Sequence, residues 1–165
     1  MKTKINHNFN LIVYDFDGVM TDNRVYLSED GKETVLFNRS DGLAVSLIKK
    51  IGIPQIIITT ETNAVVRFRA KKLEIELIHS SLDKKYDLSK YCKEKQINIK
   101  RVAYIGNDLN DLEVMKSVGF AFCPSDACSE IKAISYLCLK SKGGEGVVRE
   151  FLELLRNKFY VQEEL

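Results

Sequence analysis

The sequence predicts an α/β fold, a doubly wound, Rossmann-like parallel sheet with helices on both faces. Apolar runs of strand length alternate with segments of helical period, and this alternation is typical of such folds. Polar side chains directly follow several of these runs, as expected for sheets that bind ligands at the carboxyl ends of their strands. Because no repeat or linker interrupts the 165 residues, we expect a single domain over residues 1–165.

Each predicted element has a local signal in the sequence. QIIITT at 55–60 is apolar and β-branched, which is typical of a fully buried strand. Asp30-Gly31 predicts a two-residue turn in a β-hairpin over about residues 24–38. Ser40 or Asp41 is expected to cap the helix that Gly52 ends. The expected strands cover residues 10–14, 55–60, 75–78, 101–106, 120–123 and 136–139, the last two as edge strands. The expected helices cover residues 43–51, 63–72, 84–95, 109–118 and 147–159.

Composition and charge exclude several classes of protein. A formal net charge of +2 without a basic stripe argues against nucleic acid as a partner. The apolar stretches are too short to cross a bilayer, and MKTKINHNFN lacks the apolar region of a signal peptide. The four cysteines have no CxxC spacing, and His7 and His79 give no zinc pattern. We therefore expect a cytoplasmic protein with reduced thiols and no membrane partner.

Two acidic clusters each follow a predicted buried strand. LIVYDFDGVMTD at 11–22 places Asp15 and Asp17 two residues apart, so that both side chains point to the same side of an extended chain. GNDLND at 106–111 contains Asn107 and Asp108, with Asp111 as a supporting residue. Oxygen-rich side chains that converge from neighbouring strand ends are typical of a Mg²⁺ site.

A hydroxyl and a lysine complete a set suited to phosphoryl transfer. Asp15 is the expected nucleophile that forms an aspartyl-phosphate, and Asp17 the expected general acid and base. Thr59 at a strand end and Lys84 at a helix start are expected to bind the phosphoryl group and offset its charge. Mg²⁺ would neutralise phosphate oxygens beside Asp15.

Other interpretations fit less of the pattern. Taken alone, an acidic pair before a glycine is equally consistent with a turn. An EF-hand loop needs an oxygen ligand where Val19 stands. A phosphoacceptor receiver domain needs an aspartate near residues 55–60, where the chain has only IIITT. GGEG at 143–146 lacks the Lys-Ser/Thr ending of a P-loop and is expected to be a flexible turn.

The motifs DFDGVMTD, Thr59, Lys84 and GNDLND together resemble the haloacid dehalogenase superfamily of phosphatases. Further stretches, FNRSDGLAV, RAKKLEI, YIGNDLNDLEVMKSVGF and GGEGVVREF, are similar to the 3-deoxy-octulosonate 8-phosphate and acylneuraminate 9-phosphate phosphatases. The resemblance implies the capless subclass, in which the hairpin replaces a cap domain. It also implies Mg²⁺, a phosphorylated sugar-acid substrate, and a homotetramer whose neighbouring subunit closes the site.

The resemblance also implies substrate contacts, which are Asn38, Arg39, Ser40, Asp41, Gly42, Thr60, Glu61, Arg69 and Lys72. Glu61 stands where the octulosonate branch usually has arginine, and this favours N-acylneuraminate 9-phosphate as substrate, with octulosonate 8-phosphate as the alternative. Asn107 stands where the family usually has a metal-binding aspartate, so Asn107 or Asp108 would bind the metal. The same departure leaves open a weakly active scaffold that supports oligomerisation of a sugar-acid cytidylyltransferase. An Asp-Lys context favours Lys84 over its neighbour Lys85.

Overall fold

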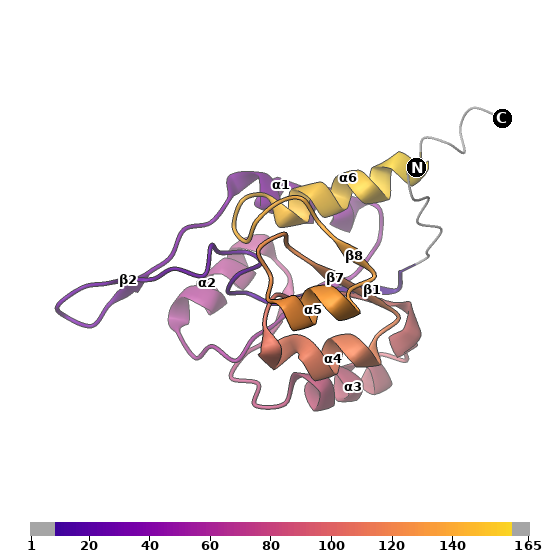
Figure 1. The fold of residues 1–165 in the computed structure, drawn as a ribbon, viewed down its shortest axis with the longest axis horizontal. Coiled ribbons are helices and arrows are strands. Elements are labelled where there is room, and N and C mark those ends of the chain that lie inside the picture. The colour runs from indigo at the N-terminus through magenta and orange to yellow at the C-terminus, as the bar shows by residue number, and fades with distance from the viewer. Residues whose placement is uncertain (1–8, 160–165) are drawn as a thin grey trace.

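The computed structural model describes residues 9–159, which form a six-stranded parallel sheet between two layers of helices (Figure 1). The strand order is β5-β4-β1-β6-β7-β8. The strands are β1 (Leu11–Tyr14), β4 (Gln55–Ile58), β5 (Glu76–Ile78), β6 (Val102–Ile105), β7 (Phe120–Cys123) and β8 (Leu137–Cys138). The helices are α1 (Arg39–Lys50), α2 (Ala64–Leu73), α3 (Lys84–Glu94), α4 (Leu112–Ser117), α5 (Ser129–Ile134) and α6 (Val147–Phe159). The predicted α/β fold with its doubly wound sheet is confirmed.

Strand β1 lies in the middle of the sheet, where Val13 is in register with Ile56 of β4 and Tyr104 of β6. From β1 the chain builds outward through β4 and β5, then returns to form β6 and continues through β7 and β8. The strand order therefore reverses between β1 and β6. In sheets of this kind, the crevice beyond the carboxyl ends of the two strands at the reversal is where ligands bind.

Alternate residues of β1 supply two separate cores. Ile12 and Tyr14 pack in the core beneath α1, α2 and α6, whereas Leu11 and Val13 pack in the core beneath α3, α4 and α5. All four residues have no exposed surface. Figure 1 shows α1 and α6 on one side of the sheet and α3, α4 and α5 on the other. A strand buried on both faces must be apolar throughout, which explains the run LIVY.

The hairpin β2 (Tyr26–Leu27) and β3 (Glu33–Thr34) projects away from the sheet (Figure 1). The predicted hairpin is confirmed, but its turn has three residues rather than two. The Ser28 amide donates to the Lys32 carbonyl at 3.0 Å, and the Gly31 amide donates to the Ser28 carbonyl at 2.9 Å. Gly31 has φ +77°, the left-handed conformation that closes a three-residue hairpin loop.

Three other local predictions are wrong. The cap of α1 is Asn38, whose side chain accepts from the Ser40 amide at 2.9 Å, rather than Ser40 or Asp41. Strand β7 lies inside the sheet between β6 and β8, so only β8 of the predicted edge pair is at an edge. The predicted helix 109–118 begins as a 3₁₀ turn, Leu109–Asp111, before α4.

None of the described helices is long and apolar enough to cross a membrane.

Helix α1 is joined to α6 by a buried carboxylate. Asp41 is 2% exposed, and its Oδ1 accepts from the Arg149 amide in the first turn of α6 at 2.9 Å. Its Oδ2 has no hydrogen-bond partner among the described residues. Burial raises the pKa of Asp41 to about 6, although the hydrogen bond from Arg149 opposes this rise. The folded chain therefore binds a proton at Asp41 more tightly than the unfolded chain does.

We expect Asp41→Asn to raise the free energy of unfolding at pH 7.5 by about 3 kcal/mol, because asparagine removes the cost of ionising a buried carboxyl. The unfolded chain releases this proton near pH 4 and the folded chain near pH 6, so the gain should shrink to about 1 kcal/mol at pH 4.5. Denaturant unfolding at the two pH values measures it, with exposed Glu29→Gln as control. A variant less stable than wild type at pH 7.5 would show that the charge of Asp41 stabilises α6 more than burial penalises it.

Candidate active site

The loop after β1 holds the predicted acidic pair. The Asp15 amide donates to the Ile105 carbonyl at 2.9 Å, which continues the β1–β6 ladder to the end of the sheet. Asp15 is 3% exposed and Asp17 is half-buried, while Phe16 between them turns into the core. Thr21 donates its hydroxyl to Asp17 Oδ1 at 3.0 Å. Both carboxylates are thus fixed at the carboxyl edge of the sheet.

Lys84 lies between two buried carboxylates. As the first residue of α3, it places Nζ 2.7 Å from Asp15 Oδ1 and 2.7 Å from Asp111 Oδ1. The Lys84 side chain is 2% exposed and that of Asp111 has no exposed surface. The neighbouring Lys85 side chain is 51% exposed, and its Nζ lies 3.9 Å from Glu113 Oε2. The structure therefore brings Lys84, and not Lys85, to Asp15.

Asp111 is held by three donors. Its Oδ1 accepts from Lys84 Nζ and, at 2.8 Å, from the Tyr104 hydroxyl. Its Oδ2 accepts from the backbone N–H of Asn107 at 3.0 Å. A Cβ at Gly106 would lie 2.6 Å from Asp111 Oδ2, so glycine is required there. No role was predicted for Tyr104, because a tyrosine inside an apolar run is indistinguishable from an ordinary core residue.

Burial and the neighbouring charges shift the pKa values of Asp15 and Lys84. Burial and the Asp111 charge raise the pKa of Asp15 to about 8, and Lys84 opposes the rise. Burial lowers the pKa of Lys84, but attraction to Asp15 and Asp111 outweighs it and the net shift is upward. Lys84 therefore stays charged. Burial also raises the pKa of Asp17, against the hydrogen bond from Thr21, so Asp17 retains a proton more readily than an exposed aspartate.

A metal at this edge would depend on Asn107. Among the described residues, no group of three or more His, Cys, Asp or Glu side chains could hold a metal ion. The side-chain amide of Asn107, however, lies 2.9 Å from the backbone carbonyl oxygen of Asp17 and 3.2 Å from Asp15 Oδ2. With its nitrogen turned inward it donates to both, and with its oxygen turned inward three oxygens converge. Octahedral Mg²⁺ ligands lie about 2.9 Å apart, given Mg–O distances of about 2.0–2.1 Å, so this donor set fits the ion.

Asp108, the alternative metal ligand, is exposed, and its Oδ1 accepts from the Leu109 amide at 2.8 Å. It still lines the cavity that opens above Asp15, which has a volume of about 310 Å³. The lining residues are Asp15, Asp17, Asn23, Thr59, Thr60, Glu61, Asn107, Asp108, Leu109 and Asn110.

Thr59 is 1% exposed at the end of β4, and its Oγ1 accepts from the Glu61 backbone amide at 3.1 Å. Asn23, Leu109 and Asn110 were not predicted, since no spacing pattern distinguishes them from loop residues.

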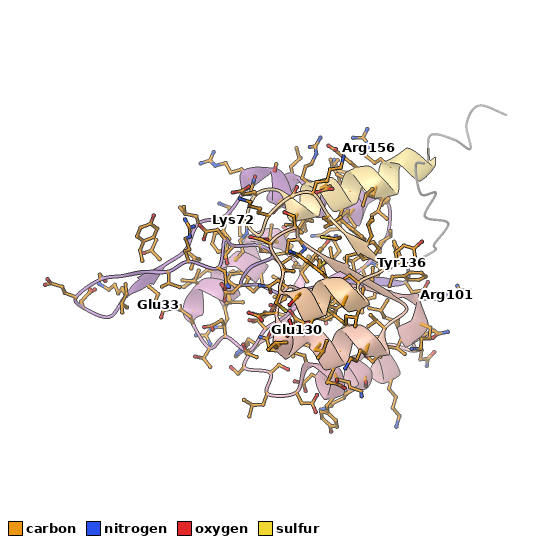
Figure 2. All side chains as sticks on the ribbon, viewed as in Figure 1. Glu33, Lys72, Arg101, Glu130, Tyr136 and Arg156 are labelled. Carbon is orange, nitrogen blue, oxygen red and sulfur yellow. The ribbon has the colours of Figure 1, made fainter. Side chains whose placement is uncertain are left out.

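A second cavity of about 180 Å³ lies between the hairpin and α2 and shares Asp17, Asn23 and Glu61 with the first. Asn63, the cap of α2, donates to Glu33 Oε2 of the hairpin at 2.6 Å and so joins its two walls. Figure 2 shows Glu33 on the hairpin. Burial raises the pKa of Glu61, and the charges of Asp17 and Glu33 raise it further. Three acidic side chains, Asp17, Glu33 and Glu61, are therefore gathered on this side of the site.

The other predicted substrate residues lie outside the lining of the first cavity, and these are Asn38, Arg39, Ser40, Asp41, Gly42, Arg69 and Lys72. Arg69 donates to the Asn38 carbonyl at 3.3 Å, and its guanidinium lies 4.6 Å from the centre of the Phe37 ring. Lys72 is exposed on α2 (Figure 2). The structure brings these residues to the start of α1 and to α2 rather than to Asp15, and their contact with substrate stays a prediction.

Comparison with known proteins agrees with this geometry. Residues 53–151 match the haloacid dehalogenase-like hydrolase family. The chain is 33% identical over 149 residues to a 3-deoxy-D-manno-octulosonate 8-phosphate phosphatase of Yersinia pestis, covering 90% of this chain and 80% of that one. It is 31% identical over 160 residues to N-acylneuraminate cytidylyltransferase A of Danio rerio, covering 93% of this chain but 37% of that protein.

A solved structure of 3-deoxy-D-manno-octulosonate 8-phosphate phosphatase from Moraxella catarrhalis, in complex with a magnesium ion, a phosphate ion and a KDO molecule, is also similar. Its TM-score is 0.87 at 33% identity, over 94% of this chain and 92% of that one. Fold, site and relatives define the class of protein, a phosphoric monoester hydrolase. The chain belongs to the haloacid dehalogenase-like hydrolase family, as the sequence motifs predicted.

We expect Lys84→Met to lower the free energy of unfolding by about 3 kcal/mol at pH 7.5, because it leaves the buried carboxyl groups of Asp15 and Asp111 without the cation that they share. The matched variant Lys85→Met removes an exposed charge and should change it by less than about 0.5 kcal/mol. Denaturant unfolding of both variants without added metal makes the comparison. Equal losses would contradict a buried ion pair at Lys84.

Proposed function

We propose that this protein is a Mg²⁺-dependent phosphatase that hydrolyses a phosphorylated sugar acid through an aspartyl-phosphate. The observation that carries the proposal is the buried contact of 2.7 Å between Lys84 and Asp15, a residue that lines an open cavity. A carboxylate held by a charged lysine at the carboxyl edge of a parallel sheet is well placed to attack a phosphoryl group.

In this mechanism Asp15 is the nucleophile and Asp17 is the general acid and base. Asp15 attacks phosphorus while Thr59 and Lys84 offset the charge on the phosphoryl oxygens. Asp17 donates a proton to the departing alkoxide and then takes one from the water that hydrolyses the aspartyl-phosphate. The raised pKa of Asp17 suits the first of these steps, since the group must carry a proton before the alkoxide leaves.

Asp15, the Asp17 carbonyl and the Asn107 amide would hold the Mg²⁺. The ion supplies positive charge that neutralises phosphate oxygens and orients them toward the nucleophile. An amide oxygen brings no negative charge, so this site should bind Mg²⁺ more weakly than one with a third carboxylate.

For the substrate we propose 3-deoxy-D-manno-octulosonate 8-phosphate, which is the compound named for the phosphatases of Yersinia pestis and Moraxella catarrhalis. The comparisons do not support the sequence-based preference for N-acylneuraminate 9-phosphate. That compound stays the second candidate, because Glu61, which stands where the octulosonate branch usually has arginine, lines the cavity. A homotetramer whose neighbour closes the site, and a cytoplasmic location, also stay predictions.

The test is phosphate release from the two sugar-acid phosphates side by side, with Mg²⁺ and with EDTA. We expect metal-dependent release, with kcat/KM at least about tenfold higher for octulosonate 8-phosphate, and no release by Asp15→Asn. A preference for the nine-carbon substrate would retain the chemistry and replace the substrate. If the folded wild type released phosphate from neither compound, a scaffold that supports a cytidylyltransferase would be the better interpretation.

We expect Asn107→Asp to lower the Mg²⁺ concentration for half-maximal activity about tenfold, because it adds a carboxylate to the metal's donor set. Asn110→Asp adds the same charge to the cavity lining and should change that concentration by less than about twofold. Titration of activity with Mg²⁺ measures both. A large rise in the Mg²⁺ requirement of Asp108→Asn, with no effect of Asn107→Asp, would assign the ligand to Asp108 instead.

A further inference from the structure

Tyr104 contacts the site through Asp111 and does not line the cavity. It lies in β6 with no exposed surface, and it is absent from the residues that line the cavity. Its hydroxyl donates at 2.8 Å to Asp111 Oδ1, the same oxygen that Lys84 Nζ approaches at 2.7 Å. One carboxylate oxygen therefore accepts hydrogen bonds from both the phenol of Tyr104 and the ammonium of Lys84.

The position of the Lys84 ammonium depends on where that oxygen is fixed. Nζ lies equally close to Asp111 and Asp15, at 2.7 Å from each. With the phenol removed, Oδ2 of Asp111 would keep its hydrogen bond from the Asn107 backbone amide, but Oδ1 would be held by Lys84 alone. The carboxylate could then turn about the Asn107 contact and draw the ammonium away from Asp15. We propose that Tyr104 is a positioning residue for phosphoryl transfer, whose hydroxyl fixes Asp111 so that Lys84 stays against Asp15. The proposal rests on the phosphatase function proposed above.

The surroundings of Tyr104 keep it in the role of donor. Burial raises the pKa of Tyr104 well above its usual value, and the negative charges of Asp111 and Asp15 raise it further. The phenol therefore keeps its proton. Hydrogen bonds to charged acceptors in a dry interior are stronger than neutral ones, so this contact can hold a carboxylate in one orientation.

Tyr14 on the neighbouring strand β1 offers a matched control. It also has no exposed surface, and its hydroxyl also donates one hydrogen bond of 2.8 Å. Its acceptor, however, is the neutral side chain of Gln55, which in turn donates to the Val45 carbonyl at 3.0 Å. Tyr14 packs in the core on the opposite face of the sheet from Tyr104. Loss of either hydroxyl thus removes one buried hydrogen bond, but only one of these bonds leads to Lys84.

The experiment compares Tyr104→Phe with Tyr14→Phe, using p-nitrophenyl phosphate and octulosonate 8-phosphate at saturating Mg²⁺. We expect Tyr104→Phe to lower kcat about tenfold and to change KM by less than about twofold, since the loss falls on the transition state. Tyr14→Phe should keep kcat within about twofold even though it loses a comparable amount of thermal stability. Equal losses of kcat in both variants, wild-type kcat in Tyr104→Phe, or an effect on KM alone would overturn the proposal.

A second readout does not depend on turnover. In crystal structures of the two variants, the separation of Lys84 Nζ and Asp15 Oδ1 should lengthen beyond 2.7 Å in Tyr104→Phe only. An unchanged separation there would overturn the positioning role. If wild type released phosphate from neither compound, the proposed phosphatase function would fail, while these structures would still decide whether Tyr104 positions Lys84.

Discussion

The ion pairs of Lys84 with Asp15 and Asp111 are the interaction on which the rest of the site depends. Burying three charges is unfavourable unless each is paired and its remaining hydrogen-bonding capacity is satisfied. Here the Tyr104 hydroxyl and the backbone N–H of Asn107 donate hydrogen bonds to the Asp111 carboxylate, so Lys84 can be shared with Asp15. This arrangement requires β1 and β6 to be neighbours, because Asp15 follows one and Asp111 follows the other. The strand order is therefore a condition of the chemistry.

The glycine-rich segment 143–146, which was predicted to be a flexible turn, packs closely beside the site. The Gly144 amide donates to the Val19 carbonyl at 3.0 Å, and a Cβ at Gly143 would lie 2.3 Å from the Gly18 carbonyl oxygen. The segment is thus packed against the loop that carries Asp17. Gly18 itself has φ +80°, and a Cβ there would collide with Asn107. Absence of side chains allows three chain segments to meet behind the acidic pair.

What the sequence could predict follows from the range of each signal. Asp15 and Lys84 could be predicted as site residues because a polar residue directly after an apolar run, or at a helix start, is a local pattern. The asparagine cap of α1 was missed because Asn38, Ser40 and Asp41 all suit a cap and only backbone geometry selects one. Tyr104 was missed for another reason. Its partner lies seven positions along the chain and on the far side of a turn, and no periodicity relates the two residues.

The charges around the cavity argue for a divalent cation independently of any relative. Of the described residues that line it, Asp15, Asp17, Glu61 and Asp108 are acidic and none is Lys, Arg or His. A phosphate monoester brings nearly two further negative charges at neutral pH. The Lys84 ammonium is already shared between two carboxylates, so it cannot balance the phosphate alone. Because repulsion between like charges is strong in a partly desolvated site, phosphate should enter only together with a cation bound near Asp15 and Asn107.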